Sequence, residues 1–170
     1  VALVAGVSMA SIRAGLNKVT PVNGRLATTI LSDGLTVVDD SYNANQASMQ
    51  AAIEVLASCP GKKVLVLGGM GELGGRSTEI HHEIARYARD RGINTLLTLV
   101  DRDHPEYLQD MDGYLSGFGD AAKSFTDVET LHAFIESYRS PTTTVLVKGS
   151  RFAQMERVVQ ALLKAEGSAC

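Results

Sequence analysis

An apolar run in the first third of the chain ends abruptly in a cluster of polar side chains. The cluster holds two carboxylates, a phenol and two carboxamides: Asp39, Asp40, Tyr42, Asn43 and Asn45. Such groups hydrogen-bond ligands that are rich in hydroxyls, such as a nucleotide sugar. Because ligands of open α/β sheets bind beyond the carboxyl ends of the strands, the cluster is a candidate binding edge. The alternative is a solvated strand-to-helix turn in which Asn45 or Ser48 only caps the next helix.

A second candidate lies near the other end of the chain, where an apolar run leads into Lys148, Gly149, Ser150 and Arg151. Ser150 is a suitable N-cap, which would place Arg151 in the first turn of a helix. Free amides and the helix dipole at such a terminus attract anions, and the two cations would strengthen this attraction. Arginine also binds carboxylates and phosphates in a bidentate manner. The alternative is a capped helix with two solvated cations.

The loop Gly69–Gly74 matches the G-x-G-x-x-G pattern of dinucleotide-binding turns. Two features depart from that pattern. The following helix is expected to begin near Thr78, several residues after the third glycine. Asp101, the acidic residue after the next predicted strand, also comes later than the usual spacing of about 20 residues. We therefore expect a mobile loop that closes over a substrate, with a dinucleotide site or a plain flexible loop as the alternatives.

Two further patterns bear on chemistry. His81 and His82 are adjacent, so on a helix they point about 100° apart and are not expected to share a metal ion. His81 is instead expected on a helix face, where it could contact a substrate. No G-x-x-x-x-G-K-[ST] segment occurs, so the main phosphate cradle for any nucleotide triphosphate would have to lie outside this chain.

Strand and helix patterns alternate along the chain and would position these groups. Apolar runs predict strands at 26–31, 35–39, 64–67, 95–100, 124–125 and 144–147. Helical patterns occupy 9–17, 47–57, 79–91, 128–138 and 152–165, whereas 101–122 is expected to be irregular. The turn Ser32-Asp33-Gly34 would join the first two strands as a hairpin. The sequence therefore predicts an α/β, Rossmann-like fold, with a mostly parallel sheet, helices on both faces and an antiparallel edge strand.

Composition excludes several classes of function. The net charge of -3 argues against broad nucleic-acid binding, and no apolar run approaches the ~20 residues that cross a membrane. No signal peptide is visible, and the two cysteines, Cys59 and Cys170, form no disulfide framework, which fits a reducing, cytoplasmic compartment. Residues 1–22 begin without a methionine and are interpreted as the tail of a preceding domain plus a linker, with residues 23–170 as the main domain.

Four motifs, in this order along the chain, resemble those of the Mur ligases and fit the MurF type best. They are Asn23-Gly24-Arg25-Leu26, the segment Asp39–Asn45, the loop Leu67–Gly74 and the junction Val147–Arg151. The resemblance covers almost the whole chain. The resemblance implies an ATP-dependent amide ligase that adds D-alanyl-D-alanine to a UDP-muramoyl tripeptide in peptidoglycan precursor synthesis. The alternative is a stand-alone Rossmann-type dinucleotide-binding module.

The resemblance implies a three-domain enzyme of which this chain is the last part. Residues 1–22 would end the central ATPase domain, which would hold most of the Mg²⁺ and phosphate contacts, and residues 23–170 would form the C-terminal domain. The partners would be the two substrates and the enzyme's own N-terminal and central domains, in a cytoplasmic monomer. A hinge at Arg25 and Leu26 would allow rigid-body closure, and the isolated chain would be inactive.

The resemblance also implies roles for individual residues. Those on the ATP side are Arg25, Asp39, Asp40, Tyr42, Asn43 and Asn45. Those that border the dipeptide or the acyl phosphate are Glu72, His81, Lys148, Ser150 and Arg151. Asp40 would accept hydrogen bonds from the ribose. No metal ligand and no certain catalytic residue is implied within the chain. Two positions depart from the family pattern, because Gln46 stands in place of a proline and Gly69 in place of an aspartate.

Overall fold

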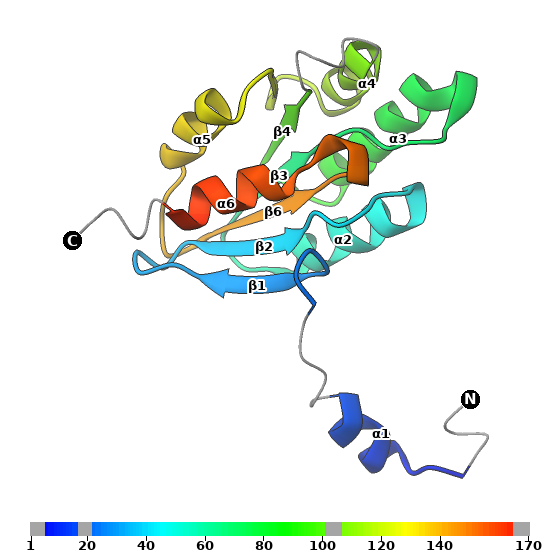
Figure 1. The fold of residues 1–170 in the computed structure, drawn as a ribbon, viewed down its shortest axis with the longest axis vertical. Coiled ribbons are helices and arrows are strands. Elements are labelled where there is room, and N and C mark those ends of the chain that lie inside the picture. Colours follow the sequence, from blue (N-terminus) through cyan, green and yellow to red (C-terminus); the bar gives the residue numbers. More distant parts are fainter. Residues whose placement is uncertain (1–5, 17–21, 101–106, 165–170) are drawn as a thin grey trace.

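The computed structural model describes residues 6–16, 22–100 and 107–164. In this part of the chain, six strands form one sheet with the order β1-β2-β6-β3-β4-β5 (Figure 1). The strands are β1 (Ala27–Ile30), β2 (Thr36–Asp40), β3 (Lys62–Leu67), β4 (Thr95–Leu99), β5 (Ala122–Phe125) and β6 (Thr143–Lys148). β1 pairs with β2 in an antiparallel manner, and the other pairs are parallel. The prediction of a mostly parallel sheet with an antiparallel edge strand is confirmed.

The edge hairpin follows from its turn residues. Gly34 adopts a φ of +86°, and the Asp33 carboxylate accepts a hydrogen bond from the Leu35 N–H at 3.0 Å. A β-carbon at Gly34 would lie 2.6 Å from that of Pro141, so the turn needs glycine for space as well as for backbone conformation. The turn fixes the register of β1 against β2 and so brings residues 22–26 beside the end of β2.

Helices cover both faces of the sheet (Figure 1). One face carries α2 (Gln46–Ser58), α3 (Ser77–Asp90) and α4 (Leu108–Phe118). The other face carries α5 (Val128–Glu136) and α6 (Glu156–Lys164). Successive strand residues alternate between the two cores, since Leu65 packs under the first set of helices and Val64 and Val66 under the second. Burial of one such aliphatic side chain contributes about 1.5–3 kcal/mol, so both layers are held mainly by apolar packing.

The prediction that residues 101–122 are irregular is wrong for Leu108–Phe118, which form α4. Gly113 and Gly117 do not break this helix but lie against α3. A β-carbon at Gly113 would be 2.4 Å from the Thr78 carbonyl oxygen, and one at Gly117 would be 2.3 Å from that of His82. The glycines therefore allow two helix backbones to pack closely. Residues 101–106, including the predicted acidic position Asp101, lie outside the described residues.

The last predicted helix also differs from the structure. A short 3₁₀ turn, η3 (Arg151–Ala153), follows β6, and Gln154 then takes a left-handed φ of +46° before α6 begins at Glu156. Ser150 makes no capping bond, so the prediction that it caps a long helix is wrong. Its hydroxyl is instead 2.7 Å from the Gly69 carbonyl oxygen and donates to it.

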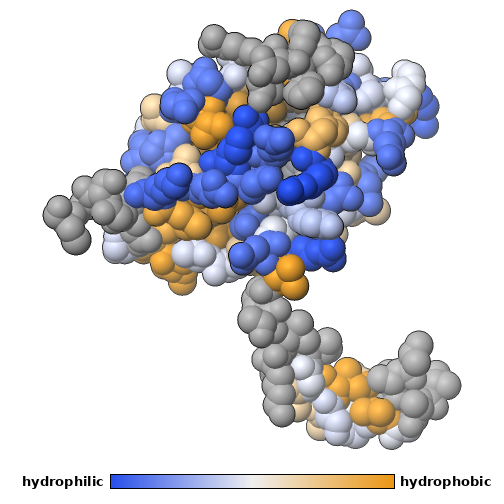
Figure 2. Space-filling view, in the orientation of Figure 1, coloured by the Kyte–Doolittle hydropathy of each residue, from blue (hydrophilic) through white to orange (hydrophobic). Residues whose placement is uncertain are grey.

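The first helix, α1 (Met9–Leu16), stands apart from the sheet in Figure 1. Met9 and the preceding Val7 are 65% and 40% exposed. Figure 2 shows apolar side chains gathered on this helix, whereas the outer face of α6 is hydrophilic. Within the described residues, no helix combines the length and the hydrophobicity that a bilayer crossing requires.

Candidate functional site

The candidate residues gather where the parallel strands end. The register pairs Lys148 at the end of β6 with Asp40 of β2 on one side and with Leu67 of β3 on the other. The helix after β6 packs on the opposite face of the sheet from the helices after β2 and β3. A strand whose connection leaves in the opposite direction from its neighbours opens a crevice at the carboxyl edge. Asp40 and Lys148 therefore emerge together at the edge where this fold type binds ligands.

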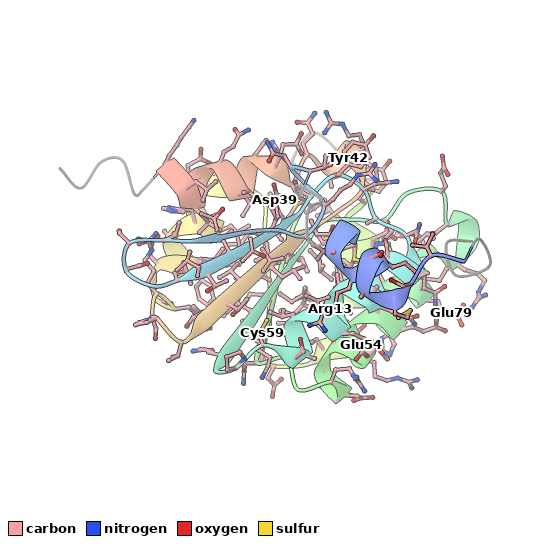
Figure 3. The ribbon with its side chains drawn as sticks, turned by 90° about the horizontal axis from the view of Figure 1, so that it is seen from below. Arg13, Asp39, Tyr42, Glu54, Cys59 and Glu79 are labelled. Atoms are coloured by element: carbon pink, nitrogen blue, oxygen red, sulfur yellow. The ribbon has the colours of Figure 1, made fainter. Side chains whose placement is uncertain are left out.

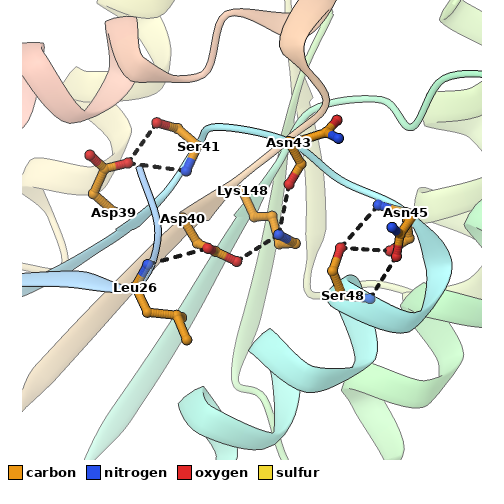
Figure 4. A network of polar contacts seen from close by, with 8 residues as sticks. All are labelled: Leu26, Asp39, Asp40, Ser41, Asn43, Asn45, Ser48 and Lys148. Carbon is orange, nitrogen blue, oxygen red and sulfur yellow. Dashed lines mark hydrogen bonds and ion pairs between the residues drawn. The ribbon is translucent and has the colours of Figure 1, made fainter. Parts of the chain in front are cut away.

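Lys148 is buried and fully engaged. Its side chain is 2% exposed, and its ammonium lies 2.6 Å from Asp40 Oδ2 and 2.8 Å from the Asn43 carbonyl oxygen, to both of which it donates (Figure 4). A cation held in this way is not available as a free anchor for a ligand carboxylate. Lys148 and Asp40 lie at the same sheet edge, but the two groups neutralise each other instead of standing as separate binding groups.

The two aspartates at the end of β2 tie the preceding turn to the sheet. Asp40 Oδ1 accepts a hydrogen bond from the Leu26 N–H at 3.2 Å, and Leu26 has a left-handed φ of +54°. Asp39 Oδ2 accepts from the Gly24 N–H at 3.1 Å, while its other oxygen accepts from the Ser41 hydroxyl at 2.6 Å and amide at 3.1 Å (Figure 4). The turn at 22–26, where a hinge was predicted, is therefore fixed to β2 by carboxylate bonds.

A cleft of about 330 Å³, here called the hairpin cleft, opens beside this network. Its lining includes Gly24, Arg25, Asp40, Tyr42, Asn43, Asn45 and Lys148. The Arg25 guanidinium lies 4.6 Å from the centroid of the Tyr42 ring, and Tyr42 is 49% exposed. An exposed aromatic ring beside a cation is suited to a flat, electron-rich group such as a nucleobase. The residues of the predicted ATP side are thus gathered at one place, and Asp39 accepts a hydrogen bond from Gly24 of the cleft lining.

Asn45 and Ser48 form a capping box at the start of α2. Asn45 Oδ1 accepts from the Ser48 N–H at 2.9 Å, and the Asn45 N–H donates to the Ser48 hydroxyl at 3.0 Å (Figure 4). The capping alternative is confirmed for the side chain of Asn45, although the residue also lines the cleft. Cys59 ends the same helix. Figure 3 shows Cys59 and Glu54 of α2 on the side of the molecule away from Asp39 and Tyr42.

A second cleft of about 380 Å³, here called the loop cleft, lies between residues 70–78 and residues 107–110. Glu72 lines it with a left-handed φ of +62° and an exposed side chain. The glycine-rich segment leads into a 3₁₀ turn, η1 (Gly74–Arg76), and α3 begins only at Ser77. The dinucleotide interpretation needs a regular helix that begins at the third glycine. Gly74 opens only a 3₁₀ turn, so this geometry is not present.

His81 lies beneath the loop cleft and is completely buried. Its Nδ1 is 2.7 Å from the Ser77 carbonyl oxygen, and its Nε2 accepts a hydrogen bond from the Met70 N–H at 3.0 Å. These two bonds place the proton on Nδ1. Burial lowers the pKa of His81 because the charged imidazolium is poorly solvated there. In this conformation both ring nitrogens are used within the protein, so His81 holds the loop from below.

Ser150 and Gly69 link the segments that follow β6 and β3. Both the hydroxyl and the amide of Ser150 donate to the Gly69 carbonyl oxygen, at 2.7 and 3.1 Å. Arg151 is largely exposed and pairs with Glu156 at 3.1 Å. The predicted anion site at a helix N-terminus is therefore replaced by a tight junction between the β6 and β3 ends. A third cleft, of about 420 Å³ between α5 and α6, is lined by none of the predicted residues.

Comparison with known proteins agrees with this arrangement. The family model described as Mur ligase, glutamate ligase domain, matches residues 24–151, which include both clefts. The chain belongs to the Mur ligase family. The UDP-N-acetylmuramoyl-tripeptide–D-alanyl-D-alanine ligase of Escherichia coli strain K12 is 39% identical over 157 residues, which cover 92% of this chain and 33% of that protein.

Solved structures of Mur ligases show the same architecture. A crystal structure of MurF from Acinetobacter baumannii is 30% identical with a TM-score of 0.79, covering 96% of this chain and 35% of that one. The MurF ligase of Thermotoga maritima, solved in complex with ADP, is 25% identical with a TM-score of 0.76, covering 94% and 37%. This chain therefore spans about a third of the length of these relatives.

The sequence did not point to several residues that shape this Mur ligase edge. Tyr107 and Asp110 line the loop cleft from the start of α4, and Phe152 of η3 stacks on Tyr107 with ring centroids 4.2 Å apart. Two of these residues fall in the segment that was expected to be irregular. Gly113 and Gly117 are four positions apart and so lie on one face of a helix. This spacing was the signal that could have predicted α4 and, with it, the positions of Tyr107 and Asp110.

Proposed function

We propose that this chain is the C-terminal domain of an ATP-dependent ligase that joins D-alanyl-D-alanine to a UDP-muramoyl tripeptide, a step of peptidoglycan precursor synthesis. The observation that carries the proposal is the gathering of four family motifs at one carboxyl edge, in a chain 39% identical to a ligase named for that reaction. The enzyme would be a cytoplasmic monomer. Residues 1–22 would be the end of its central ATPase domain, and residues 23–170 the domain proper.

The hairpin cleft would bind the nucleotide. Tyr42 with Arg25 offers a stacking surface, and Asp40, Asn43 and Asn45 supply polar groups to the lining beside it. The binding of ADP by the Thermotoga maritima relative supports a nucleotide role for the family. The central domain would hold Mg²⁺ and most phosphate contacts, because this chain lacks a phosphate loop.

The chemistry would depend on position more than on a protein nucleophile. ATP would phosphorylate the terminal carboxylate of the tripeptide, and the dipeptide amine would then attack the acyl phosphate with release of phosphate. Transfers of this kind are accelerated mainly by orientation and by stabilisation of developing charge. This domain would bring the amine to the reacting edge by rigid-body closure, in which the turn at Arg25 and Leu26 would move together with the sheet to which Asp39 and Asp40 bind it.

The structure changes the role proposed for Lys148. Its ammonium would hold Asp40 and the Asn43 carbonyl in place for the nucleotide and would leave carboxylate binding to Arg151, whose side chain is exposed. Ser150 would fix the loop cleft through Gly69, and His81 would do so through Met70. Glu72 would face the dipeptide directly from the loop.

The test is an assay of the full-length product of the gene that encodes this chain. We expect release of ADP and phosphate that requires both the UDP-muramoyl tripeptide and D-alanyl-D-alanine, with an amide product detected by mass spectrometry. The 170-residue chain alone should release none. ADP release without either substrate, or turnover by the isolated chain, would contradict the proposal.

A further inference from the structure

One acidic side chain in the loop cleft has no role in the proposed function. Asp110, in the first turn of α4, lines the cleft and is only 6% exposed. Within the described residues, its ion-pair partner is His81 alone, with Nδ1 at 3.8 Å from Asp110 Oδ1. That distance is too long for a hydrogen bond.

His81 cannot neutralise this carboxylate in the observed state. The proton on its Nδ1 is directed to the Ser77 carbonyl oxygen at 2.7 Å, and burial lowers the pKa of the imidazole, which keeps it uncharged. A mostly buried carboxylate that borders a cleft and has no strong donor nearby is weakly stabilised, because it has lost much of its hydration. Asp110 is therefore suited to receive a cation or an N–H donor from outside the protein.

The rest of the loop cleft has the same electrostatic preference. Its described lining contains a second carboxylate, Glu72, and neither a lysine nor an arginine. Arg76 belongs to the same loop but is turned towards α3, where it lies 2.9 Å from Glu79 and 3.9 Å from Glu83. A ligand that complements this cleft carries positive charge where it meets Asp110.

The wall beside Asp110 limits the size of the ligand. Tyr107 borders both the loop cleft and a small apolar hollow of about 10 Å³, which Phe152 and Met111 also line. Tyr107 and Phe152 are stacked at 4.2 Å, and a β-carbon at Gly69 would lie 3.1 Å from the Phe152 ring. Such a hollow has room for about one methyl group.

We propose that the loop cleft binds the α-ammonium group of the incoming amine substrate through Asp110, with a methyl-sized side chain against the Tyr107–Phe152 pair. This inference rests on the proposed function, because it names the group of the dipeptide that the loop cleft recognises. Asp110 would touch the substrate, whereas His81 acts as a positioning residue that holds the loop through the Met70 amide.

The kinetic test uses the full-length gene product with Asp110→Asn. We expect KM for D-alanyl-D-alanine to rise about 10- to 100-fold, the range for loss of one charge-assisted hydrogen bond, while KM for ATP and for the tripeptide stays the same. Asp112→Asn, on the exposed side of the same helix, is the matched control and should change none of the three. An unchanged dipeptide KM would leave Asp110 with only a helix-stabilising role and would overturn the proposal.

A second measurement tests binding alone and uses the unaltered chain, so it depends neither on turnover nor on the folding of a variant. Amide shifts of the 170-residue chain are followed during titration with D-alanyl-D-alanine and with its N-acetyl derivative, which carries no ammonium. Residues 107–110 should shift with the free dipeptide only; equal responses to both, or none to the free dipeptide, refute the amine site. If the full-length protein forms no amide product while the free dipeptide still shifts these residues, the proposed function fails and the amine site stands.

Discussion

The two clefts at the carboxyl edge are built in opposite ways. In the hairpin cleft the ionic groups are already paired, since Lys148 and Asp40 lie 2.6 Å apart and backbone amides hold both Asp39 and Asp40. In the loop cleft the backbone is rich in glycine, and the buried Asp110 has no hydrogen-bonded cation in the described part of the chain. One cleft is complete before a ligand arrives, and the other lacks a positive group that a ligand can supply.

The difference suggests which cleft is rigid and which can adapt to its ligand. A paired, buried network resists rearrangement because each group that loses its partner stays desolvated. Such a network suits a ligand that every member of a ligase family shares. A glycine-rich loop fixed at few points, here by His81 below and Ser150 beside it, adapts more easily to a variable substrate.

The largest expected effect comes from breaking the paired cleft with Lys148→Met. Removal of the ammonium leaves Asp40 without its cation at a mostly buried position, so we expect a loss of about 3–5 kcal/mol in the free energy of unfolding. Denaturant unfolding of the 170-residue chain measures this loss, and Lys164→Met, at an exposed position on α6, is the control. A loss below about 1 kcal/mol would mean that the pair behaves like a surface ion pair.

A smaller effect is expected where α3 meets α4 beside the loop cleft. In Gly117→Ala the new β-carbon would meet the His82 carbonyl oxygen at 2.3 Å, which forces the two helices apart. Overpacking of this kind costs about 1–3 kcal/mol. Gly75→Ala is the matched control, since a β-carbon there meets nothing within 4 Å. Equal thermal stability of the two variants would show that close helix packing does not support the loop cleft.

His81 is expected to make the stability of the loop-cleft side depend on pH. Its folded pKa is lowered from 6.5, mainly by burial, so the unfolded chain binds a proton more readily than the folded chain. Stability linked to this group is complete above about pH 6.5 and decreases as the pH falls below that value, by at most about 1.4 kcal/mol per pH unit. Urea midpoints measured from neutral to acidic pH should follow this trend, and His81→Gln should reduce the slope. An unaltered slope in the variant would assign the pH dependence to other groups.

The smallest effect is expected at the open side of the hairpin cleft. Tyr42→Ala removes the ring that lies 4.6 Å from the Arg25 guanidinium, and an exposed cation–π contact contributes only about 0.5–1 kcal/mol. We expect a few-fold rise in KM for ATP in the full-length protein, with KM for D-alanyl-D-alanine unchanged. A rise in the KM for the dipeptide instead would mean that the two ligands are assigned to the wrong clefts.

The sequence predicted what short-range chemistry controls. The Asp33-Gly34 turn and the alternation of strands and helices depend on neighbouring residues, and both are present. The polar cluster after β2 was also found, because its residue types contrast with the apolar run before it.

The features that the sequence could not predict depend on contacts between residues that are far apart along the chain. Lys148 meets Asp40 only because β6 inserts between β2 and β3, an order that no local pattern contains. Ser150 bonds the Gly69 carbonyl instead of capping a helix, and Gly117 packs a helix against α3 in a segment that was expected to be irregular. In each case a long-range contact outweighs the local preference of the residue.

The most direct test of the account is a titration of the ¹⁵N-labelled 170-residue chain with ADP and, separately, with NAD, each at high concentration. If the hairpin cleft is the nucleotide site of a Mur ligase domain, ADP shifts the amides of residues 24–26 and 40–45 and leaves residues 69–74 in place. Selective shifts of residues 69–74 with NAD, without a response to ADP at 40–45, would contradict it and support a dinucleotide-binding module.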